Sequence, residues 1–170
     1  MDFKKLSDQY RDELLNNVLP FWLQNSQDKE FGGYFTCLDR EGKVFDTDKF
    51  IWLQGREVWM FSMLYNKVEK RQEWLDCAVQ GGEFLKKYGH DGNYNWYFSL
   101  DRSGRPLVEP YNIFSYTFAA MAFGQLSLAT GNQEYADIAR KTFDIILSKV
   151  DNPKGKWNKL HLGTRNLKNF

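Results

Sequence analysis

Residues 49–65 read KFIWLQGREVWMFSMLY, and this stretch decides how the rest of the chain is interpreted. Its length and composition predict a helix that is apolar on nearly all sides. Trp52, Arg56, Trp59 and Met63 share one face, because residues three to four apart lie on the same side of a helix. A guanidinium among tryptophans needs a counter-charge or water. The stretch therefore predicts either a helix that lines a wet, aromatic-walled cavity or a core helix whose arginine pairs with a structural carboxylate.

The composition fits one domain and excludes some classes of partner. The 170 residues carry 23 basic and 22 acidic side chains, and the basic ones are scattered. Nothing in this balance favours a nucleic acid or an anionic membrane surface. No apolar run is long enough for a membrane span, and the first residues do not resemble a secretory signal. Cys37 and Cys77 lack metal-ligand spacing, so we expect two free thiols and a cytoplasmic location.

An internal repeat divides the chain. The pattern Leu-Asp-Arg-x-Gly-basic occurs at residues 38–43 and again at residues 100–105. An aspartate that opens a turn, followed by glycine three residues later, is typical of a β-hairpin. We therefore interpret Asp39 and Asp101 as turn formers, not as a pair of catalytic acids.

Two helices are expected after each hairpin. Apolar residues at helical spacing predict helices over about 49–68, 72–88, 112–129 and 133–149. A further helix begins near Phe3, and Pro20 should kink or end it because proline has no amide hydrogen. Helical hairpins that cannot bury their faces alone must stack on their neighbours, either as an open solenoid or as a closed toroid. Composition does not choose between these two arrangements.

Four long segments carry a resemblance to a known family. They are FGGYFTCLDREGKVFD (31–46), KFIWLQGREVWMFSMLY (49–65), EPYNIFSYTFAAMAFGQL (109–126) and GKWNKLHLGTRNL (155–167). Together they resemble the N-acylglucosamine 2-epimerase family, which includes the renin-binding proteins. The resemblance implies an all-α fold, the (α/α)6 toroid. Because family members are about twice as long, residues 1–170 are expected to be the N-terminal part of a single barrel domain, with about five helices and two short β-hairpins.

The resemblance also implies an activity, the interconversion of N-acyl-D-glucosamine and N-acyl-D-mannosamine. Inversion at C2 requires a base, an acid and a group that stabilises the enolate oxygen at C1. The family match assigns that last role to Arg56, which we expect to be catalytic. The two catalytic histidines of the family lie in the second half of the barrel, beyond this chain. His90 and His161 match neither motif and are interpreted as solvated loop residues.

Further candidates for substrate binding come from the helix that carries Arg56 and from the fourth expected helix. Trp52 and Trp59 are placed to stack on a sugar ring, although core packing explains them equally well. Gln54 is close enough to assist Arg56, whereas Glu57 should point elsewhere as a structural carboxylate. The start of the fourth expected helix should face the mouth of the toroid, which adds Tyr111, Asn112, Ser115 and Tyr116.

No cofactor or metal is expected, because no nucleotide-binding motif and no metal-ligand cluster is visible in the sequence. Some family members are activated by ATP, but no residue here marks a site for it. The expected partners are an amino-sugar substrate and, because an incomplete toroid exposes an apolar seam, a second copy in a homodimer. A cellobiose 2-epimerase or mannose isomerase-like enzyme and a non-catalytic carbohydrate-binding or interaction fragment remain alternatives. A toroidal glycoside hydrolase needs two opposed carboxylates, for which no convincing pair is found.

Overall fold

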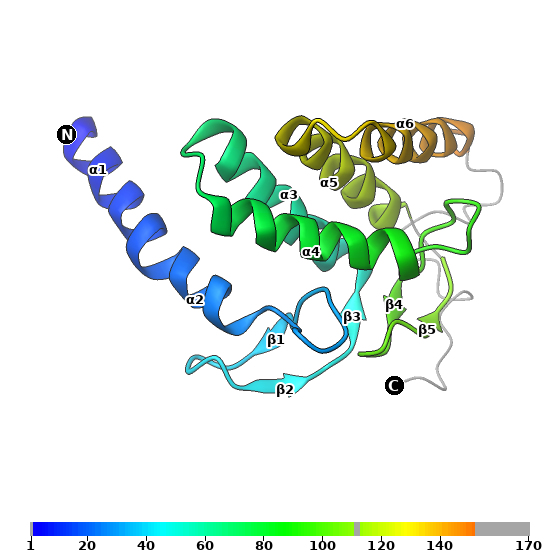
Figure 1. Ribbon diagram of the computed structural model, residues 1–170, viewed down its shortest axis with the longest axis horizontal. Coiled ribbons are helices and arrows are strands. Elements are labelled where there is room, and N and C mark those ends of the chain that lie inside the picture. Colours follow the sequence, from blue (N-terminus) through cyan, green and yellow to red (C-terminus); the bar gives the residue numbers. More distant parts are fainter. Residues whose placement is uncertain (1, 111–112, 152–170) are drawn as a thin grey trace.

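The structure, a computed structural model, describes residues 2–110 and 113–151, and it is built mainly from helices (Figure 1). The long helices pair off after a leading helix, as the sequence predicts. The helices are α1 (Phe3–Glu13), α2 (Leu19–Asn25), α3 (Ile51–Lys67), α4 (Gln72–Tyr88), α5 (Phe114–Thr130) and α6 (Gln133–Ser148). The short strands are β1 (Cys37–Leu38), β2 (Val44–Asp46), β3 (Lys49–Phe50), β4 (Ser99–Leu100) and β5 (Pro106–Val108).

The leading helix continues through Pro20, which corrects the expectation that this proline ends it. A π-helical turn, η1 (Leu14–Val18), joins α1 directly to α2. Proline interrupts an α-helix because its ring clashes with the carbonyl four residues earlier and it donates no hydrogen bond. The wider π turn immediately before Pro20 places the proline in the first turn of α2, where its missing amide hydrogen costs little.

Both predicted β-hairpins are confirmed. β1 pairs with β2 and β4 with β5, each antiparallel. In the turns, a carboxylate oxygen of Asp39 accepts from the amide of Lys43 at 2.8 Å, and one of Asp101 accepts from the amide of Arg105 at 2.9 Å. These contacts explain both aspartates as turn formers. β3 also pairs with β4, so a three-stranded sheet of order β3-β4-β5 joins the two repeats.

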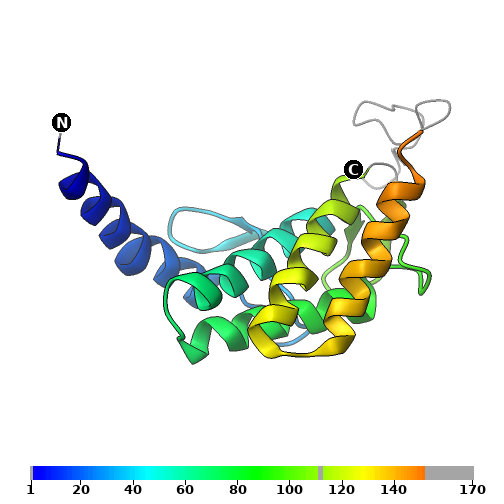
Figure 2. The ribbon, with the colours of Figure 1, turned by 90° about the horizontal axis from the view of Figure 1, so that it is seen from above.

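α3 and α5 lie side by side and run in the same direction, with α4 packed on α3 and α6 packed on α5 (Figures 1 and 2). Gly55 allows the close approach, because a Cβ atom there would lie 3.0 Å from the backbone of Phe118. Val58 and Phe61 of α3 are fully buried in this core. Each contributes roughly 1.5–3 kcal/mol by removing apolar surface from water.

A buried charge cluster fixes the start of α3. The ammonium of Lys49, just before the helix, donates to a carboxylate oxygen of Asp28 at 2.9 Å and to the carbonyls of Gly32 and Arg102. The guanidinium of Arg102 also donates to Asp28. Although burial raises the pKa of Asp28, the hydrogen bonds from Arg102 and Lys49 hold it at about 2. The cluster ties the loop after α2 to both repeats.

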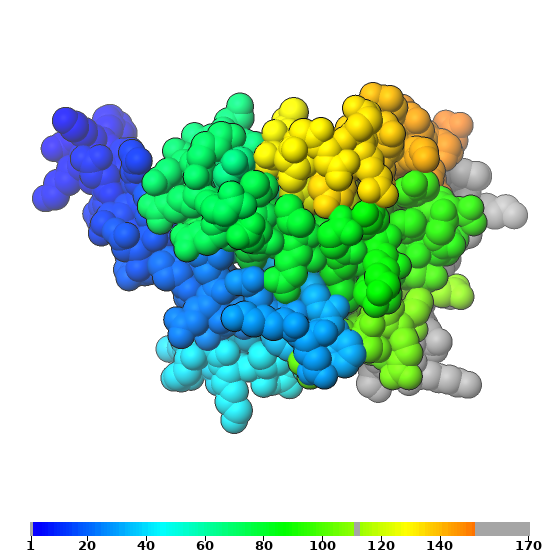
Figure 3. Space-filling model, viewed as in Figure 1, coloured from blue at the N-terminus to red at the C-terminus, as the bar shows by residue number. Residues whose placement is uncertain are grey.

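Apolar side chains remain exposed at two edges of the described part of the chain. α1 reaches beyond the main body (Figure 3), and its Phe3 and Tyr10 are about three-quarters exposed. At the other edge, Leu128 of α5 and Phe143 and Leu147 of α6 are also exposed. No helix among the described residues is long and apolar enough to cross a membrane.

Candidate functional site

Arg56 lies in the second turn of α3, and its side chain is exposed at the concave junction of three elements. Its guanidinium carbon lies 5.6 Å from the centre of the Phe118 ring, a cation–π arrangement. Within residues 2–110 and 113–151, no carboxylate lies close enough to form an ion pair with it. The structure therefore does not show the alternative of a buried arginine paired with a structural carboxylate.

A cavity of about 290 Å³ opens beside this guanidinium, and we call it the Arg56 pocket. α2, the segment before β1, and α3 supply its walls. Its lining residues are Trp22, Thr36, Leu53, Arg56, Glu57 and Met60. The pocket thus combines an indole, a hydroxyl, a cation, a carboxyl group and two apolar side chains, a mixture typical of sites for small polar ligands.

Sequence reasoning missed four of the lining residues, which are Trp22, Thr36, Leu53 and Met60. Oγ1 of Thr36 is buried, and its hydroxyl lies beside the thiol of the neighbouring Cys37. Trp22 belongs to the leading helix, where its sequence gives no sign that it meets Arg56. Only the packing of α2 on α3 brings these side chains together.

Glu57 lines the same pocket, which corrects the expectation that it points elsewhere. Consecutive residues on a helix differ by about 100°, so both can border one wide cavity. Its side chain is buried, and Oε1 lies 2.5 Å from the hydroxyl oxygen of Ser26. Burial raises the pKa of Glu57 to about 8.

The other candidates on α3 lie outside the lining of the Arg56 pocket. Trp52 is half-buried and packs against Phe118, with ring centres 5.9 Å apart. Trp59 is half-buried against the core. Gln54 is fully buried, and its amide accepts from the Tyr34 amide and donates to the Tyr34 carbonyl, both at 2.8 Å. These two bonds give Gln54 a defined structural role, holding the segment before β1 on α3.

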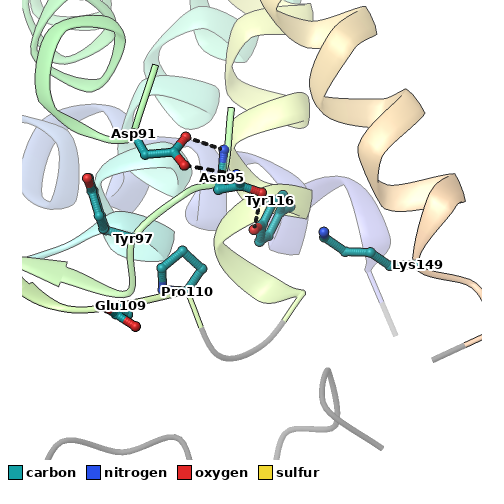
Figure 4. Close-up of a pocket in the computed structure, with 7 residues that line it drawn as sticks. All are labelled: Asp91, Asn95, Tyr97, Glu109, Pro110, Tyr116 and Lys149. Atoms are coloured by element: carbon teal, nitrogen blue, oxygen red, sulfur yellow. Dashed lines mark hydrogen bonds between the residues drawn. The ribbon is translucent and has the colours of Figure 1, made fainter. Parts of the chain in front are cut away.

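Of the candidates on the fourth expected helix, Tyr116 borders a second cavity, of about 430 Å³ (Figure 4). Its lining residues are Asp91, Asn95, Tyr97, Glu109, Pro110, Tyr116 and Lys149. The hydroxyl of Tyr116 donates to Asn95, whose amide nitrogen donates to Asp91. Ser115 is buried next to Tyr116. Tyr111 and Asn112 lie outside the described residues.

The two cavities lie at the same end of the helix pair. Arg56 and Tyr116 both belong to the first two turns of their helices, and α3 and α5 run in parallel (Figure 2). The structure therefore gathers Arg56 and Tyr116 at the amino-terminal ends of these helices. It does not place Trp52, Gln54 or Trp59 in either cavity lining.

His90 packs among aromatic rings. Its ring is stacked on Tyr94 and lies edge-on to Trp96, each with centres 4.8 Å apart. Burial lowers the pKa of His90, and its Nδ1 accepts from the amide of Gly92. It is half-buried, not freely solvated. His161 lies outside the described residues, which themselves contain no cluster of three His, Cys, Asp or Glu suited to a metal ion.

Comparison with known proteins gives these cavities a context. The sequence model of the N-acylglucosamine 2-epimerase family matches residues 33–169, which include Arg56 and most of the lining residues. The chain belongs to this family. Similar family members include the mouse N-acylglucosamine 2-epimerase, 43% identical over 146 residues, and a cellobiose 2-epimerase of Dictyoglomus turgidum, 28% identical over 167 residues.

The chain spans about a third of the length of the curated family members that it matches first. The alignment with the mouse protein covers 83% of this chain and 35% of that protein, and the Dictyoglomus alignment covers 93% and 42%. A sugar epimerase from a ruminal bacterium is structurally similar, with a TM-score of 0.77 and 28% identity over 84% of this chain and 36% of that one. The fold is thus part of the family's (α/α)6 barrel, as the sequence predicts.

Proposed function

We propose that this chain is part of a sugar epimerase that interconverts N-acyl-D-glucosamine and N-acyl-D-mannosamine by deprotonation and reprotonation at C2. Family membership and the 43% identity to the mouse N-acylglucosamine 2-epimerase support the reaction. The observation that carries the proposal is Arg56, a cation without an ion-pair partner among the described residues, exposed beside a small, mainly apolar cavity.

Arg56 would act on the oxygen next to the reacting carbon. Removing the C2 proton of an open-chain N-acyl amino sugar moves negative charge onto the C1 oxygen, which forms an enolate. A guanidinium stays charged at any working pH and donates in a planar fork, so it stabilises this oxygen more than it stabilises the starting carbonyl. Trp22 offers an apolar face to the sugar carbons.

The general acid and base would come from elsewhere. The resemblance places the family's two catalytic histidines in the second half of the barrel, and His90 is packed between Tyr94 and Trp96. We therefore expect this chain alone to bind substrate weakly and to epimerise it little or not at all. Rapid exchange of the C2 proton of N-acetylmannosamine for deuterium, catalysed by this chain, would contradict this assignment.

The test of the Arg56 role is a binding experiment. Saturation-transfer NMR should detect N-acetylmannosamine on the wild-type chain, and Arg56→Gln should lose most of the signal. The matched control is Arg40→Gln, which removes an exposed arginine from the β1–β2 turn and should leave binding unchanged. Equal binding by the wild type and Arg56→Gln, with both folded, would refute the role of Arg56.

A second candidate function is epimerisation or isomerisation of another sugar. The Dictyoglomus cellobiose 2-epimerase aligns with 93% of this chain, although at lower identity. A panel of N-acetylglucosamine, N-acetylmannosamine, cellobiose and mannose separates the candidates, because the proposal requires the N-acyl sugars to bind more tightly. A non-catalytic carbohydrate-binding fragment would bind one of these sugars, and no added second half of the barrel would make it turn that sugar over.

The remaining expectations stand as proposals. Residues 1–170 would form one part of a single barrel domain, and the chain would form a homodimer through its exposed apolar edges, which light scattering checks. The free thiols of Cys37 and Cys77 support a cytoplasmic location, which fractionation of the source cells checks. Sugar-induced shifts of the indole signals would test whether Trp52 and Trp59 contact substrate.

A further inference from the structure

The carboxyl group beside Arg56 raises a question that the proposed function leaves open. Glu57 is next to an arginine and lines the same pocket, yet no ion pair joins the two among the described residues. An ionised glutamate at this position would partly neutralise the guanidinium. A neutral one would leave the full positive charge available to a ligand.

Hydrogen-bond geometry indicates the neutral form. The hydroxyl oxygen of Ser26 lies 2.7 Å from the carbonyl oxygen of Trp22 and 2.5 Å from Oε1 of Glu57. A hydroxyl group has a single hydrogen, and a carbonyl can only accept. Both short contacts are satisfied when Ser26 donates to Trp22 and a protonated Glu57 donates to Ser26. An ionised Glu57 would leave one of the two oxygen pairs without a hydrogen between them.

Among the described residues, no other group that changes charge near neutral pH faces Glu57. From the segment before β1, Tyr34 faces it, and from α4, Cys77 faces it. Burial raises the pKa of both groups, so both are neutral well above pH 7. Ser26 at the end of α2 does not titrate in this range. Arg56 on the same helix stays charged. Glu57 is therefore the group whose ionisation would alter the field in this pocket.

We propose that Glu57 is held as a neutral carboxylic acid, so that Arg56 keeps its full charge and the Arg56 pocket accepts a negatively charged oxygen of an open-chain sugar. Glu57 is here a positioning residue that acts through Arg56. The ligand class rests on the proposed function, because the enolate is such an anion. An open-chain sugar acid has a carboxylate in place of the C1 aldehyde and therefore presents a similar charged oxygen to the guanidinium.

The protonation state is tested without any ligand. Infrared difference spectra between the wild type and Glu57→Gln should show the carbonyl stretch of a protonated carboxylic acid at pH 7, replaced by carboxylate bands at pH 9. Glu41→Gln, which changes an exposed glutamate in the β1–β2 turn, is the matched control, and the bands assigned to Glu57 should persist in it. Carboxylate bands from Glu57 at pH 7 would overturn the inference.

The effect on the ligand is tested with 2-acetamido-2-deoxy-D-gluconate, the sugar acid of N-acetylglucosamine. Its affinity for the wild type, measured by titration calorimetry, should fall about tenfold between pH 7 and pH 9, because one proton must stay bound to Glu57. Glu57→Gln should bind it equally at both pH values, and Arg56→Gln should lose binding at both. The same fall with pH in Glu57→Gln would overturn the role of Glu57.

The two proposals fail in different ways. If the wild type binds N-acetylmannosamine but not the sugar acid at pH 7, this inference is wrong and the proposed function stands. If it binds the sugar acid with the expected dependence on pH but no neutral sugar, the inference stands and the proposed function is wrong. If it binds neither while correctly folded, both are wrong.

Discussion

Replacing Glu57 by glutamine should stabilise the fold above pH 5, and the size of the effect follows from burial. The folded chain holds the pKa of Glu57 at about 8, against an ordinary value of 4.5. Between these values the folded state keeps a proton that the unfolded state releases, so the free energy of unfolding falls as pH rises. Each pH unit is worth roughly 1.4 kcal/mol. At pH 7 the wild type has therefore lost about 3 kcal/mol relative to pH 4.5.

The free energy of unfolding of the glutamine variant does not fall in this way, because its side-chain amide does not titrate. This amide can both donate and accept, so it keeps a hydrogen bond with the hydroxyl of Ser26, which lies against Oε1 of Glu57. Urea unfolding followed by circular dichroism at pH 5, 6, 7, 8 and 9 measures the difference. The advantage of Glu57→Gln should grow steadily from pH 5 and level off above about pH 8. Parallel curves for the wild type and Glu57→Gln would refute the neutral, buried carboxyl, and Glu41→Gln should follow the wild type.

Two further substitutions test the framework around the site. Asp28→Asn should lower the free energy of unfolding by roughly 3–5 kcal/mol, because it leaves the fully buried ammonium of Lys49 without its counter-charge. Urea unfolding of the wild type and the variant measures this difference. An unchanged unfolding midpoint would contradict it. Gly81→Ala should cost roughly 1–3 kcal/mol, because its Cβ would lie 2.2 Å from the buried Tyr34 hydroxyl. Gly124→Ala is its control, since no atom lies within 4 Å, and thermal unfolding should show it no less stable than the wild type.

Local patterns in the sequence were sufficient to predict the helices and the β-hairpins. The helix expected at 49–68 is Ile51–Lys67, and the one expected at 72–88 is Gln72–Tyr88. Such elements depend on contacts between residues close in sequence, so periodicity and turn residues predict them. Pro20 shows the limit of a local rule. A π-helical turn precedes this proline and places it in the first turn of α2, so the helix continues.

By itself the sequence determined the repeated helical architecture, the family and the choice of Arg56. Only the tertiary structure decided which side chains surround that guanidinium. Trp22, Thr36 and Glu57 come from separate elements and carry no shared sequence pattern, because their meeting depends on how α2 and the segment before β1 pack against α3. Tertiary packing also set the charge of Glu57, since a carboxyl group changes its pKa only when the fold removes water from it.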